Sequence, residues 1–81
     1  MRILITDSEN KRVAIEINEN ALIRELIEKL KNKKNINIDI ILHFNGEILE
    51  ENETISSYGI ENNSNIIYMG QFKGGNLYKY N

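Results

Sequence analysis

Apolar and polar residues alternate with a period of two in residues 2–6 and again in residues 12–17. This period places every second side chain on one side of a strand, so it predicts two half-buried strands. The polar stretch between them, residues 7–11, contains Asn10, and asparagine tolerates the left-handed backbone conformation that a hairpin loop needs. The chain is therefore predicted to begin with a β-hairpin.

The spacing of the apolar residues changes after this hairpin. In residues 22–30 apolar side chains recur three and four positions apart, which is typical of one face of an amphipathic helix. Asn20 is the expected N-cap, and Asn35 is the expected stop because asparagine tolerates the left-handed conformation. The pattern predicts a helix of about three turns, from near Ala21 to near Lys34.

A second β region follows the predicted helix. Residues 40–44 form an apolar strand pattern, Asn-Gly at 45–46 is a strong hairpin signal, and residues 47–49 are the expected return strand. Residues 64–69 are predicted to form the last strand. The polar stretch before it contains three isolated apolar anchors, Ile55, Tyr58 and Ile60.

The order strand, strand, helix, strand, short strand, strand predicts an α+β fold in two layers. We expect a mixed sheet of four to five strands with the helix on one face. Residues 1–70 are predicted to form this domain, and residues 71–81 a flexible tail. The predicted core residues are Ile3, Ile5, Val13, Ile15, Ile17, Ile23, Leu26, Leu30, Leu42, Leu49, Ile55, Ile60 and Ile66.

The composition argues against several classes of function. The chain has no cysteine, which excludes disulfides, thiol catalysis and cysteine-based metal sites. Its formal net charge of −2 argues against a nucleic-acid partner, which requires a clustered basic surface. The basic run at 29–34 coincides with the predicted helix end, where cations complement the helix dipole. Since no apolar run suits a membrane span or a secretory signal, we expect no membrane partner and a cytoplasmic or nuclear location.

A pair of glycines follows the last predicted strand. Gly74 and Gly75 are followed in the sequence by residues 76–81. Glycine has no Cβ, so an extended Gly-Gly backbone fits a narrow enzyme channel and can present a terminal carboxylate there. Taken alone, the same pair is equally well explained as a hinge before a tail.

The middle of the chain resembles the ubiquitin family. Residues 42–50 read Leu-His-Phe-Asn-Gly-Glu-Ile-Leu-Glu, and residues 54–60 read Thr-Ile-Ser-Ser-Tyr-Gly-Ile. They are similar to the family's Leu-x-Phe-x-Gly, Leu-Glu and Thr-Leu-Ser-x-Tyr-x-Ile pattern, and the resemblance extends from Met1 to Gly75. It implies the β-grasp fold and a role in covalent tagging of other proteins.

The resemblance assigns roles to the residues near the tail. A processing protease would cut between Gly75 and Asn76, next to Gly74, so the chain would be a precursor. Activating and conjugating enzymes would then join the Gly75 carboxylate to lysines of target proteins by an isopeptide bond. The chain would act as a monomer, without catalysis of its own and without a cofactor or metal.

Several positions depart from ubiquitin. Ubiquitin is usually recognised through an apolar patch, and the matching positions here are Ser8, His43 and Met69, so ordinary ubiquitin receptors should bind poorly. Gln71 stands where ubiquitin has an arginine that its activating enzyme reads, which implies a dedicated activating enzyme. The predicted recognition surface consists of Ser8, His43, Met69, Gln71, Phe72 and Lys73.

The lysine positions also differ. Lys11, Lys29 and Lys33 match ubiquitin lysines and are possible acceptors for chain formation. Glu47 and Asn62 occupy the positions of ubiquitin's two best-known linkages. Chains of those familiar kinds are therefore not expected.

Three functions remain open: a covalent modifier, a non-covalent interaction module whose tail is not processed, and a β-grasp sulphur carrier, which would also be adenylated at Gly-Gly. An enzyme is the least supported reading, because no nucleophile–base pair, carboxylate dyad or phosphate loop stands out. His43 has no cysteine or second histidine as a metal-binding companion, so we expect it on a solvent-facing strand position. In a binding face it would make recognition sensitive to pH.

Overall fold

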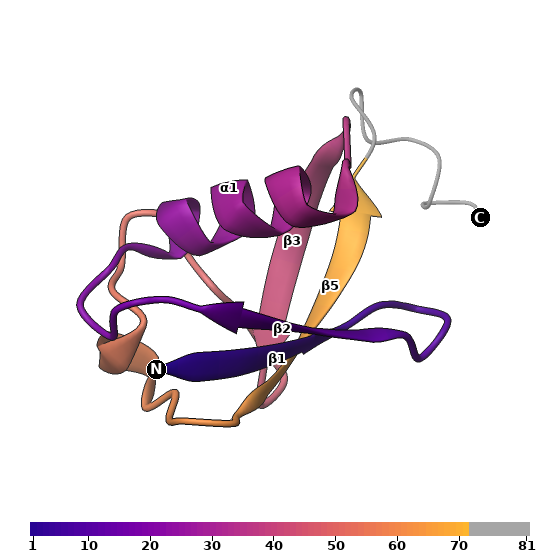
Figure 1. Cartoon of the computed structure of the whole chain (residues 1–81). Helices are drawn as coiled ribbons and strands as arrows, with labels where there is room; N and C mark the ends of the chain where they lie inside the picture. Colours follow the sequence, from indigo (N-terminus) through magenta and orange to yellow (C-terminus); the bar gives the residue numbers. More distant parts are fainter. Residues whose placement is uncertain (72–81) are drawn as a thin grey trace.

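The computed structural model describes residues 1–71, which form a five-stranded mixed sheet with one α-helix on one face (Figure 1). The strands lie in the order β2-β1-β5-β3-β4, which confirms the predicted α+β, β-grasp architecture. In chain order the elements are β1 (Arg2–Thr6), β2 (Arg12–Glu16), α1 (Ile23–Lys34), β3 (Asp39–Phe44), β4 (Glu47–Ile48), the 3-10 helix η1 (Ser56–Tyr58) and β5 (Asn65–Gln71).

The last strand lies in the middle of the sheet. β5 pairs in parallel with β1 and antiparallel with β3, whereas β1–β2 and β3–β4 are antiparallel hairpins. The two hairpins are far apart in the sequence and do not pair with each other. β5 therefore joins them into one sheet, and the face opposite α1 runs across all five strands.

Helix α1 begins later than its sequence pattern predicts, and Asn20 is not its N-cap. The N–H of Asn20 instead donates to Asn18 Oδ1 (2.7 Å) in a turn, and Leu22 precedes the helix in an extended conformation. The N–H of Ile23 donates to the carbonyl of Glu53 (2.8 Å). The segment before η1 thus supplies an acceptor that a capping side chain would otherwise supply.

Left-handed residues close the predicted elements. Asn10 in the β1–β2 loop has φ 64°, and Asn35 after α1 has φ 58°, as the sequence predicts. The turn between β3 and β4 has positive φ at both Asn45 (55°) and Gly46 (78°), which is the type I′ geometry that matches the twist of a two-residue hairpin.

The core lies between α1 and the sheet. Of the predicted core residues, Val13 is only half-buried, because it lies on β2 at the edge of the sheet. Ile27 and Ile40 are buried although the predicted set omitted them. The buried apolar residues are Ile3, Ile5, Ile15, Ile17, Ile23, Leu26, Ile27, Leu30, Ile40, Leu42, Leu49, Ile55, Ile60 and Ile66.

β5 extends beyond Met69, where the sequence pattern ends. Gly70 lies opposite Ile40 and Gln71 opposite Asp39, so the backbone of β3 holds two residues that have no apolar periodicity. A Cβ at Gly70 would come within 2.6 Å of Ile38 Cδ1. The absence of a side chain at Gly70 therefore lets Ile38 lie against β5 near the C-terminal end of this strand.

Candidate functional site

The sheet face opposite α1, here called the outer face, carries a row of side chains from all five strands. Residues paired across neighbouring strands point to the same face. The register pairs Arg12 with Thr6, Thr6 with Ile67, Ile67 with His43, and His43 with Ile48. The outer row therefore consists of Arg12, Thr6, Ile67, His43 and Ile48.

The outer face carries large apolar side chains on β4, β3 and β5. Ile48 is 56% exposed and Ile67 48% exposed, and both flank the half-buried His43. Met69 is 49% exposed and lies opposite Ile41 on β3. Single exposed apolar residues are common, but large apolar side chains gathered on neighbouring strands mark a protein-docking surface.

The predicted recognition residues are only partly brought together. His43 and Met69 lie on the outer face on adjacent strands, Ser8 lies in the β1–β2 loop, and Gln71 ends β5. Ile67 and Ile48 keep the surface around His43 apolar, and neither was predicted from the sequence as part of it. The Ile66-Ile67 doublet was a usable signal, because neighbouring residues in a strand face opposite sides and only one of the two can be in the core.

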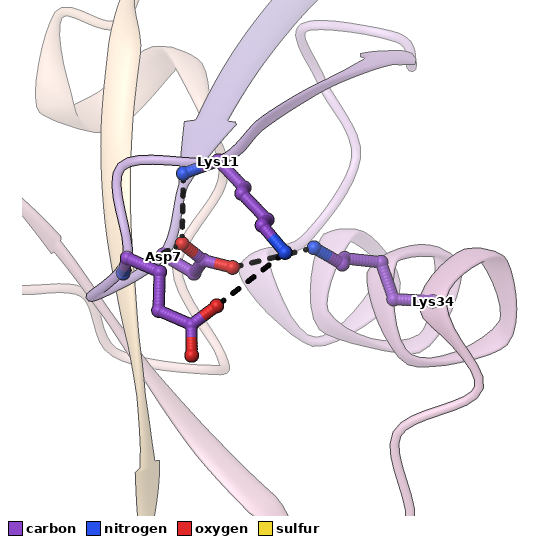
Figure 2. Close-up of polar contacts among 4 residues, drawn as sticks. Asp7, Lys11 and Lys34 are labelled. Carbon is purple, nitrogen blue, oxygen red and sulfur yellow. Dashed lines mark hydrogen bonds and ion pairs between the residues drawn. The ribbon is translucent and has the colours of Figure 1, made fainter.

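Asp7 ties the β1–β2 loop to the end of α1 (Figure 2). Its Oδ1 accepts hydrogen bonds from the N–H groups of Lys11 (2.9 Å) and Glu9 (2.8 Å), and its Oδ2 lies 3.5 Å from Lys34 Nζ. The Lys11 N–H is the main cause that lowers the pKa of Asp7, assisted by Glu9 and by the Lys34 charge. Lys34 Nζ also lies 5.8 Å from the centroid of the Tyr68 ring on β5. These contacts join the loop, α1 and β5 near the end of β5.

The three candidate acceptor lysines have different surroundings. Lys11 has a 72% exposed side chain, 3.5 Å from the equally exposed Glu9 carboxylate. Lys29 and Lys33 instead donate to backbone carbonyls of β2, each at 3.0 Å. An attack on an incoming electrophile would require these two amines to leave their acceptors, whereas Lys11 would have to break its exposed ion pair with Glu9, which is weak.

The predicted cleavage and conjugation residues, Gly74, Gly75 and Asn76, lie outside the described residues, as do Phe72 and Lys73. Gly75 follows Gln71, the last residue of β5, by four positions in the sequence. Within residues 1–71 no group of three or more His, Asp or Glu side chains is placed to hold a metal ion. No helix in the same range has the length and apolar character to cross a membrane.

Comparison with known families agrees with this architecture. Residues 1–67 match the family described as Rad60-SLD, "Ubiquitin-2 like Rad60 SUMO-like". A comparison with curated proteins finds no match. The matched range includes all of α1, the first four strands and the first residues of β5, and it stops before the glycine pair. The chain therefore belongs to the Rad60-SLD family of ubiquitin-like, SUMO-like domains.

Proposed function

We propose that the chain is a ubiquitin-like protein modifier, cut after Gly75 and joined through the Gly75 carboxylate to lysines of target proteins. The observation that carries this proposal is the position of Gly74-Gly75, a few residues after the central strand of a ubiquitin-like domain. Glycines there leave the two residues before the scissile bond without side chains, which favours entry of this segment into a narrow protease or activating-enzyme channel.

The domain itself would supply the surface that other proteins read. Ile67, Ile48 and Met69 each keep about half of their surface in water, and docking of an apolar partner would bury it. His43 lies between Ile67 and Ile48, so a partner that covers the outer face would also desolvate an imidazole.

A second candidate is a non-covalent docking domain whose tail is never processed. The exposed apolar residues of the outer face favour it, because they lie within residues 1–71 and need no cleavage to bind a partner. The family match is equally compatible with this role, since it covers residues 1–67 and does not include Gly74-Gly75.

Intact-mass measurement separates the two roles. The full chain is incubated with an extract of the cells that produce it, beside a Gly74→Ala/Gly75→Ala variant as the matched control. The modifier role predicts a wild-type product that ends at Gly75, adducts on other proteins, and neither from the control. An uncut chain would overturn the modifier role and leave the docking domain. A terminal thiocarboxylate would instead identify a sulphur carrier.

A further inference from the structure

β2 is the long open edge of the sheet. Within residues 1–71 it pairs only with β1, and the opposite edge strand, β4, has two residues. The N–H of Leu4 on β1 donates to the carbonyl of Ser64, on the β5 side (2.9 Å). This N–H therefore points away from Ala14, the residue of β2 that is paired with Leu4. Paired backbone groups alternate in direction along an antiparallel strand. Ala14, and with it Arg12 and Glu16, therefore directs its N–H and C=O away from β1.

Two lysines of α1 occupy carbonyls of this edge. Lys33 Nζ donates to the Ala14 carbonyl and Lys29 Nζ to the Glu16 carbonyl, each at 3.0 Å. The spacing matches: four residues of a helix rise about 6 Å, and two residues of a strand about 6.6 Å. We call this pair of contacts the lysine latch. It covers backbone acceptors that another strand would need for pairing.

The sequence of β2 is complementary to itself in the antiparallel direction. β2 reads Arg12-Val13-Ala14-Ile15-Glu16. If two copies pair around Ala14, each Arg12 lies opposite Glu16 of the second copy, and each Val13 lies opposite Ile15. Opposite charges and β-branched residues placed across two strands both stabilise pairing.

The backbone directions fit the same arrangement. Arg12, Ala14 and Glu16 are the residues whose N–H and C=O face outward, so each Arg12–Glu16 and Ala14–Ala14 pair would exchange hydrogen bonds. The side chain of Glu16 is 77% exposed, and its contact within the described residues is the terminal amine of Met1 at 3.5 Å. Such an exposed ion pair is weak and easily replaced by Arg12 of the second copy.

We propose that β2 is a self-association edge for a second copy of this chain and that the lysine latch holds it closed. Opening the latch leads to an antiparallel β2–β2 pair that joins the two sheets. This interaction does not depend on the glycine pair or on any partner of the outer face.

Sedimentation analysis of the full chain tests the proposal. The latch variant is Lys29→Gln/Lys33→Gln, because glutamine is too short to reach the carbonyls from α1. The matched control is Lys11→Gln/Lys31→Gln, which changes the net charge equally and leaves both latch contacts in place. We expect a monomeric wild type and control. The latch variant should dimerise with a Kd at least about tenfold lower than that of the wild type, because its pairing does not have to break two charge-assisted hydrogen bonds per copy.

Further variants test the register within the latch variant. Ala14→Pro removes an N–H that faces away from β1, so the hairpin keeps its ladder and the dimer should be lost. Arg12→Glu should also abolish the dimer by like-charge repulsion, and adding Glu16→Arg should restore it. A dimer that tolerates Ala14→Pro and Arg12→Glu would overturn the proposed register.

Circular dichroism establishes whether the latch variant is folded. A folded latch variant that stays monomeric, or that pairs with a different protein through β2, would overturn the proposal. If the variant unfolds, the wild type at millimolar concentration provides the test by NMR. The amide resonances of Arg12, Ala14 and Glu16 should then shift with concentration more than those of Val13 and Ile15, and concentration-independent spectra would overturn the self-association edge.

Discussion

Two neighbouring isoleucines of β5 should respond very differently to the same substitution. Ile66 is fully buried in the core, where it is paired with Ile5 of β1, and Ile67 is 48% exposed in the outer row. Ile66→Ala and Ile67→Ala remove the same atoms from the same strand. The loss of β propensity is therefore common to both variants, and the difference between them reports only on the two faces of the sheet.

The magnitudes follow from burial. Truncation of a fully buried isoleucine to alanine lowers the free energy of unfolding by about 2–5 kcal/mol, because the loss of transfer free energy and the cost of the cavity add together. Ile67 has about half of its surface in water already, so its truncation should cost about 1 kcal/mol or less. A chain of 81 residues has a free energy of unfolding of about 4–12 kcal/mol. Ile66→Ala thus removes a large share of the stability, whereas Ile67→Ala leaves a folded protein.

Urea denaturation followed by circular dichroism measures both values. Equal m-values for the two variants would show that the compared states expose similar surface. Equal losses of stability, or a larger loss for Ile67→Ala, would refute the assigned direction of the two side chains and with it the outer row. The stable Ile67→Ala variant is then the reagent for measuring how much the outer face contributes to partner binding.

Three further outcomes are expected. The pKa of Asp7 is lowered in the folded protein, so its stabilising contribution is present above the ordinary pKa of 3.8 and is lost as pH falls through the pKa of the folded state. Asp7→Asn should therefore lower the melting temperature at pH 7 but not at about pH 2. The control is Asp39→Asn, which removes an exposed ion pair at 4.0 Å. Gly59 has φ 75°, and a Cβ added there would meet only open space. Gly59→Ala should therefore lower the free energy of unfolding by about 1–2 kcal/mol from backbone strain alone, and an unchanged stability in urea denaturation would contradict the positive φ. In a chain that ends at Gly75, Gln71→Arg should raise thioester formation with ubiquitin's activating enzyme by about tenfold or more, and efficient charging without the substitution would contradict the need for a dedicated enzyme.

Local sequence determined the elements of this fold. The period-two and helical patterns fixed where strands and helix occur, because each element must bury one face whatever its neighbours are. Asn10, Asn35 and Asn45-Gly46 fixed the chain reversals, because their left-handed conformations depend on the residue itself. The prediction of Asn20 as the N-cap was wrong because the N–H of Ile23, at the start of the helix, donates to the carbonyl of Glu53, thirty positions away in the sequence.

The surfaces that carry the proposals were decided by long-range register. Ile67, His43 and Ile48 become neighbours only because β5 and β4 both pair with β3, and the lysine latch exists only because α1 lies along β2. Period-two patterns show which residues share one strand face but not which strands lie side by side. The sequence by itself therefore determined a ubiquitin-like domain followed by Gly74-Gly75, and the tertiary structure decided which residues share the outer face and which carbonyls of β2 the α1 lysines contact.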